Sequence, residues 1–115
     1  MNKIDKILQK IKKFIDERDW NQFHNPKDLA LSLSLEAAEV LELFQWKNKK
    51  QAQDYIKNNK ERLSEELADV FYWTLLISSK FDIDIVEALE DKLEKNKKKY
   101  PIRKSKGRAD KYNEL

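Results

Sequence analysis

The sequence contains no cysteine, and only one glycine, two prolines and one histidine among its 115 residues. The lack of cysteine excludes a disulfide framework, a thiolate metal site and a cysteine nucleophile. The sequence has neither a G-x-x-x-x-G-K-[ST] loop nor a G-x-G-x-x-G turn, which excludes P-loop and Rossmann mechanisms. Few turn formers and 39% charged residues favour helix, so we expect one all-α domain with a modest core.

Long apolar runs are also missing. No stretch approaches the ~20 apolar residues that span a bilayer, and the start, MNKIDKILQK, lacks the apolar segment of a signal peptide. We therefore expect a cytoplasmic protein without a membrane partner. The formal net charge is only +3, but basic residues crowd between Lys92 and Lys111. That stretch is the one feature that suggests nucleic-acid binding, and the near-neutral total charge argues against such a partner.

Apolar residues recur at helical spacing in several segments. The four expected long helices cover residues 4–18, 26–46, 60–80 and 84–100. Asn25 is the predicted N-cap of the second helix, with Pro26 at its first position. The polar stretch 47–60 has room for a short fifth helix. Residues 1–101 are thus predicted to form a bundle of four to five helices, and residues 102–115 a charged, extended or disordered C-terminal tail.

Two acidic pairs lie in the most apolar parts of the chain. Glu36 and Glu39 occur in LSLSLEAAEVLELFQW, and Glu66 and Asp69 in SEELADVFYWTLLI. The i, i+3 spacing places both carboxylates of a pair on one helix face, one turn apart. A buried carboxylate is costly unless it pairs with a cation or binds a metal. Because a loop separates the two pairs, their helices can run antiparallel with all four carboxylates at one level.

Such a cluster indicates a divalent cation. Ligand sets made only of oxygen suit Mg²⁺ or Mn²⁺, and Mg²⁺ in proteins commonly binds substrate phosphates beside a few carboxylates. The pattern therefore suggests metal-assisted phosphoryl chemistry. The alternative is that these four residues are ordinary surface carboxylates that pair with lysines.

Aromatic and amide side chains form a second group of candidates. They occupy a loop and two helices: Trp20, Asn21, Gln22, Phe23, His24, Trp46 and Trp73. The loop could stack on a base and hydrogen-bond to its edge, or it could close the end of a helical bundle. The two later tryptophans could be a ligand platform or part of the core. Composition alone favours the structural alternative, and it likewise favours a solvated face for the lysines that begin at Lys92.

The combination of these motifs resembles the MazG-like all-α nucleoside triphosphate pyrophosphohydrolases, and most closely their dCTP pyrophosphatase branch. The resemblance spans roughly the whole chain. Four stretches carry it: RDWNQFHNPKDLALSL, EAAEVLELFQWK, EELADVFYW, and NKKKYP followed by RKSKGRADKYNEL. It implies a helical bundle that assembles as an intertwined homo-oligomer, usually a tetramer. It also implies hydrolysis of a nucleoside triphosphate between the α and β phosphorus atoms.

The resemblance also assigns roles to residues. It implies that the four carboxylates bind Mg²⁺ and carry the catalysis. It implies that the loop Trp20–His24, Trp46 and Trp73 form the nucleoside pocket. Three further positions match residues that face the nucleotide, often from a neighbouring subunit: Lys92, Asn96 and Tyr100.

The chain departs from the vertebrate form of that branch at two positions. A pocket histidine aligns near Ile11, and a tyrosine stands where this chain has Trp73. The departures concern base preference and leave the metal ligands intact. The expected activity is therefore Mg²⁺-dependent hydrolysis of dCTP or a related pyrimidine deoxynucleotide. The alternatives are a broad house-cleaning hydrolase of non-canonical triphosphates and a non-catalytic helical oligomer that binds or regulates.

Overall fold

The computed structural model describes residues 1–114, and this range is helical with no strand. The prediction of an all-α fold is confirmed. The chain divides into two compact units, Met1–Phe81 and Asp82–Leu115. The first unit contains α1 (Lys3–Glu17), the 3₁₀ helix η1 (Asn21–Phe23), α2 (Pro26–Glu42), α3 (Lys49–Asn58) and α4 (Lys60–Lys80). None of the helices within residues 1–114 is long and apolar enough to span a membrane.

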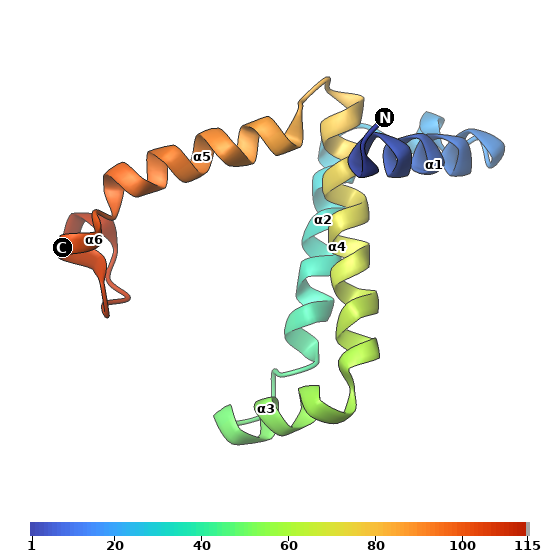
Figure 1. Cartoon of the computed structure of the whole chain (residues 1–115). Helices are drawn as coiled ribbons and strands as arrows, with labels where there is room; N and C mark the ends of the chain where they lie inside the picture. The colour runs from blue at the N-terminus through green and yellow to red at the C-terminus, as the bar shows by residue number, and fades with distance from the viewer. Residues whose placement is uncertain (115) are drawn as a thin grey trace. The chain divides into compact units, whose positions relative to one another are not determined.

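The first unit is built on the pairing of α2 with α4. The two helices lie side by side and antiparallel, and α3 connects them at one end (Figure 1). Helix α1 packs against α4. The most deeply buried side chains are Ile15 from α1, Leu29 from α2 and Leu75 from α4, each 1% exposed. One apolar residue from each helix therefore joins the three into a small core.

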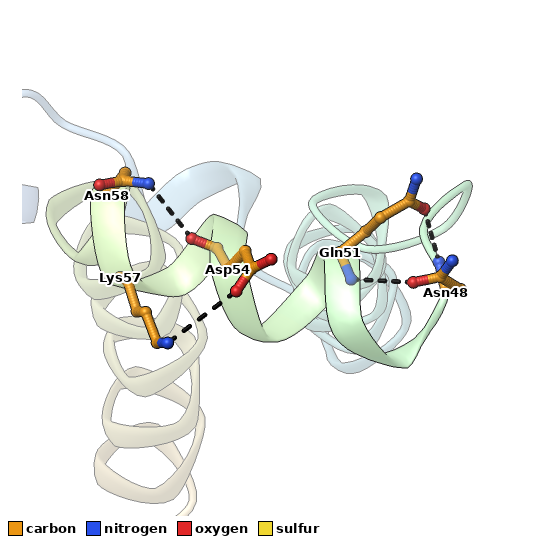
Figure 2. A network of polar contacts seen from close by, with 5 residues as sticks. All are labelled: Asn48, Gln51, Asp54, Lys57 and Asn58. Carbon is orange, nitrogen blue, oxygen red and sulfur yellow. Dashed lines mark hydrogen bonds and ion pairs between the residues drawn. The ribbon is translucent and has the colours of Figure 1, made fainter.

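Side-chain caps define where several helices begin. Asn25 Oδ1 accepts a hydrogen bond from the Asp28 amide at 3.0 Å, and Pro26 is the first helical residue, as predicted. Figure 2 shows the start of α3, where Asn48 and Gln51 form a capping box with both reciprocal bonds present. The capping box marks where the connection from α2 ends and α3 begins. Helix α3 is the short fifth helix that the sequence suggests, and its presence is confirmed.

Helix α2 ends at Glu42, four residues earlier than expected. The backbone tightens into turns there, because the Phe44 amide bonds to the Leu41 carbonyl at 2.9 Å. The Lys47 ammonium then donates to the Leu43 carbonyl at 2.6 Å, which satisfies an acceptor that the helix would otherwise leave free. Trp46 consequently sits in a turn and not on the helix.

The second unit contains α5 (Ile85–Lys99), α6 (Ile102–Ser105) and the 3₁₀ helix η2 (Tyr112–Glu114). Asp84 caps α5 by accepting a hydrogen bond from the Glu87 amide at 3.1 Å, as the sequence predicts. The expectation of an extended or disordered tail is wrong for the two short helices. Contacts between Tyr100 and Tyr112, and between Arg108 and Asp110, hold this segment together. The domain boundary near residue 101 stays a prediction.

We predict that Leu75→Ala lowers the free energy of unfolding by about 2–5 kcal/mol, because it leaves a cavity in the core of the first unit. Urea denaturation followed by circular dichroism measures this change. Ile102→Ala is the control, since Ile102 is 82% exposed, and its effect should stay within about 0.5 kcal/mol. Equal effects of the two substitutions would contradict the assigned core.

Candidate metal centre and adjoining pocket

The antiparallel pairing of α2 and α4 brings the two acidic pairs together. Glu36, Glu39, Glu66 and Asp69 each offer a carboxylate oxygen within 4.8 Å of the others. Their burial is graded: Glu66 is buried, Glu36 and Glu39 are half-buried, and Asp69 is exposed. One side of the cluster thus faces the protein interior and the other is open to solvent.

The donor set fits a divalent cation. Glu36 Oε2 and Glu66 Oε2 are buried, and neither has a hydrogen-bond partner among the described residues. Buried polar atoms without partners are uncommon and costly in native proteins. Mg²⁺ binds oxygen at about 2.1 Å, so ligands on opposite sides of the ion are roughly 4.2 Å apart. The observed spacing is therefore close to what an all-oxygen site for Mg²⁺ or Mn²⁺ requires.

One cation of the chain reaches the cluster. Arg62 Nε donates to Glu66 Oε1 at 3.4 Å, one helical turn away along α4. Among the ion pairs within residues 1–114, this is the one that involves any of the four carboxylates. The cluster therefore carries a surplus of negative charge, with a single nearby arginine to offset it.

A left-handed turn at the end of α1 positions Trp20. Asp19 has a φ of 54°, and the Asp19 and Trp20 amides donate back to Asp16 and Ile15 carbonyls at 3.1 and 3.2 Å. This is the bonding of a Schellman motif, in which an apolar residue after the turn packs on the last turns of the helix. The Trp20 ring accordingly meets the Phe14 ring edge-to-face at 5.6 Å.

Edge-to-face contacts continue from Trp20 across the first unit. Phe14 meets Tyr72 at 6.4 Å, Tyr72 meets Trp73 at 5.2 Å, and Trp73 meets His24 at 6.0 Å. Such pairs stabilise by about 0.5–1.5 kcal/mol each beyond the area they bury. The rings from α1, α4 and the loop between α1 and α2 therefore hold one another in place.

Four of these rings line a pocket of about 470 Å³ that also includes Asp69 of the carboxylate cluster. Its walls come from α1, from α4 and from the loop between α1 and α2: Lys10, Ile11, Phe14, Trp20, Asp69, Tyr72 and Trp73. The volume lies in the usual range for small-molecule sites. Because Asp69 belongs to both the cluster and the pocket, a ligand bound between the rings would have one end at the carboxylates.

A second, smaller pocket of about 230 Å³ shares Trp20 and Trp73 with the first. It is more polar, since His24, Asp28 and Ser32 line it. His24 Nδ1 is buried without a hydrogen-bond partner among the described residues. Burial, and then the positive charge of Lys80, lower the pKa of His24 below its usual value. The neutral imidazole that results offers one donor and one acceptor.

Two amides of the same loop are engaged locally. Asn21 donates to Asp16 at 2.7 Å, and the Gln22 amide donates to the Asp19 carbonyl and carboxylate at 3.0 Å. These bonds brace the loop that carries Trp20 and His24. A direct role for Asn21 and Gln22 in ligand binding stays a prediction.

Besides Asn21 and Gln22, four more of the expected nucleotide-binding residues line neither of these two pockets. Trp46 is 88% exposed in the turn after α2. Lys92, Asn96 and Tyr100 belong to the second unit, in α5 and at its C-terminal cap. Their assignment to the nucleotide stays a prediction.

Sequence reasoning missed three residues that line the larger pocket: Lys10, Phe14 and Tyr72. Phe14 lies on the apolar stripe of the first helix, so its periodicity predicted core packing. Tyr72 sits between Asp69 and Trp73 in the sequence, and that proximity to a predicted ligand was the available signal. Burial raises the pKa of Tyr72, and the charge of Arg18 partly offsets that rise.

Comparisons with known proteins identify the family of the chain. Residues 31–115 match the model of the MazG-like family. The chain is similar to dCTP pyrophosphatase 1 of Rattus norvegicus (39% identity) and of Homo sapiens (36%), each over 104 residues and 89% of this chain. It spans about 61% of the length of these curated relatives. A solved pyrophosphatase from Archaeoglobus fulgidus is 36% identical, with a TM-score of 0.83, over 88% of this chain and 94% of that chain. The chain belongs to the MazG-like family.

Proposed function

We propose that this protein is a nucleoside triphosphate pyrophosphohydrolase that uses Mg²⁺, or Mn²⁺ in its place, and prefers dCTP or a related pyrimidine deoxynucleotide. The observation that carries the proposal is the position of Asp69, which belongs to the four-carboxylate cluster and also lines the aromatic pocket. A nucleoside triphosphate has the matching parts, an aromatic base at one end and a polyphosphate that binds divalent cations at the other. The names of the relatives agree with this substrate class.

In this proposal, Glu36, Glu39, Glu66 and Asp69 hold the divalent cation. When bound, the cation neutralises charge on the triphosphate and so favours attack by water. The oxygen of water forms a bond to the α- or the β-phosphorus, and the bond between that phosphorus and the bridging oxygen breaks. The proton lost by the water passes to solvent. The products are a nucleoside monophosphate and pyrophosphate. The rings of Trp20 and Trp73 hold the base, which orients the triphosphate towards the carboxylates.

We predict that Asp69→Asn and Glu39→Gln each lower kcat by ~100-fold or more, because each substitution removes a charged ligand oxygen. Helical content by circular dichroism should stay unchanged. Glu65→Gln is the matched control, since Glu65 is an exposed carboxylate on α4 outside the cluster. Full activity of the wild-type protein in excess EDTA would refute the metal requirement.

We also propose a homo-oligomer, with a tetramer as the expected form. Five large apolar side chains on the α2–α4 pair are about half exposed or more in the single chain: Leu31, Leu35, Leu41, Leu67 and Phe71. Large exposed apolar surface on a small protein often marks an interface. In this proposal, a second copy that covers this surface also supplies residues to the nucleotide, with Asn96 and Tyr100 as the candidates.

The prediction for assembly concerns Leu35, which is 58% exposed on α2. Light scattering on the wild-type protein should give the mass of a tetramer. Leu35→Glu should reduce that mass, because a carboxylate at an interface is desolvated without a partner. Gln53→Glu, an exposed change on α3, should leave the mass unchanged. A fully active wild-type monomer would contradict the assembly.

Base selection in this proposal depends on polar groups and not on pocket size. A pocket of about 470 Å³ accommodates either a single-ring or a double-ring base. Stacking on tryptophan tolerates any base. Discrimination therefore needs donors and acceptors that a wrong base leaves unpaired, and His24, Asp28 and Ser32 in the neighbouring pocket offer them.

We predict that kcat/KM for dCTP exceeds that for dATP and dGTP by about tenfold or more. A panel of triphosphates with Mg²⁺, with the products separated by ion-exchange chromatography, measures this ratio. His24→Phe should lower the ratio while it retains an aromatic ring in place. Equal or higher kcat/KM for the purines would favour the broad house-cleaning hydrolase.

A further inference from the structure

The carboxylate cluster is electrostatically unfavourable in the absence of a metal. Four carboxylates whose oxygens lie within 4.8 Å repel one another, and Glu66 is only 8% exposed, so water screens it poorly. In residues 1–114, the one side-chain cation in ion-pair contact with any of them is Arg62. Some of the repulsion is therefore offset from within the chain.

The Arg62–Glu66 contact is suited to a loosely held counter-ion. The Nε–Oε1 distance of 3.4 Å is at the long end for a hydrogen bond. The Arg62 side chain is 60% exposed, whereas that of Glu66 is 11% exposed. The guanidinium can therefore move towards solvent without loss of buried contacts, while the carboxylate stays in place. The other oxygen of Glu66, Oε2, stays buried and unpartnered.

We propose that Arg62 is the resident counter-cation of the carboxylate cluster and that its positive charge opposes the binding of a divalent cation there. This inference rests on the metal site of the proposed function. The arginine offsets the charge of Glu66 in the metal-free protein, which stabilises that state. Once a divalent cation occupies the cluster, the same positive charge repels it. Arg62 thus lowers the affinity of the site for metal and stabilises the metal-free cluster.

Loss of the Arg62 charge should raise the affinity for Mg²⁺ and lower the melting temperature of the metal-free protein. Arg62→Gln removes the charge, so it should raise the affinity for Mg²⁺ alone by about three- to tenfold. Isothermal titration calorimetry without nucleotide measures this affinity. The same variant in EDTA should melt about 2–4 °C below the wild type, because Glu66 loses its counter-ion. Arg62→Lys keeps the charge and should stay within about twofold of the wild-type affinity.

Lys60→Gln is the matched control, because it removes one positive charge from an exposed position on the same helix. It should change the Mg²⁺ affinity and the melting temperature much less than Arg62→Gln. Equal effects of the two variants would show a general charge effect and overturn the proposal. A fall in affinity in Arg62→Gln would also overturn it, because Arg62 would then orient Glu66 for the metal. If the wild type binds no Mg²⁺, the metal site of the proposed function fails, and the melting comparison in EDTA still decides the ion pair.

Discussion

The first unit depends on one constraint, which is that two acidic pairs must meet on the inner faces of two packed helices. Desolvation and mutual repulsion both oppose that meeting. The packing of α2 against α4 overcomes them, with Leu29 and Leu75 buried at 1% exposure. The apolar sequence around each acidic pair therefore has a second function besides folding: it forces the carboxylates into one place. In a site assembled in this way, the carboxylates repel one another even when no ligand is bound.

The distribution of polar partners follows from this constraint. The side-chain hydrogen bonds of the first unit join residues close by in the sequence, as at the caps formed by Asn25 and Asn48. Glu36 Oε2 and Glu66 Oε2 are buried and have no such partner in the part of the chain that the structure describes. Local bonding thus shapes the helix ends, while long-range packing alone creates the unsatisfied atoms. That contrast separates the structural polar groups of this protein from those available for chemistry.

Much of the site could be predicted because it follows from local chemistry. The caps at Asn25 and Asp84, and the i, i+3 acidic spacing, depend on residues close in the sequence. The pocket wall that was missed depends on tertiary packing, whereas the early end of α2 depends on local hydrogen bonds. Tyr72 becomes a pocket wall only when α1 packs on α4, and α2 ends early because of the turn that Lys47 supports. The left-handed turn at Asp19 could not be predicted from the sequence, because the residue at such a turn is usually glycine.

The turn at Asp19 couples the stability of the C-terminal end of α1 to the shape of the larger pocket. The backbone bonds that end α1 are the same bonds that place Trp20, so fraying of the last helical turn and opening of the pocket wall are one event. Helix ends are among the least stable parts of a fold, and they open in local fluctuations that leave the core intact. A ligand stacked on Trp20 would shift that equilibrium towards the closed helix end. The affinity for such a ligand would therefore include the free energy of ordering the helix end, which would couple helix capping to ligand binding.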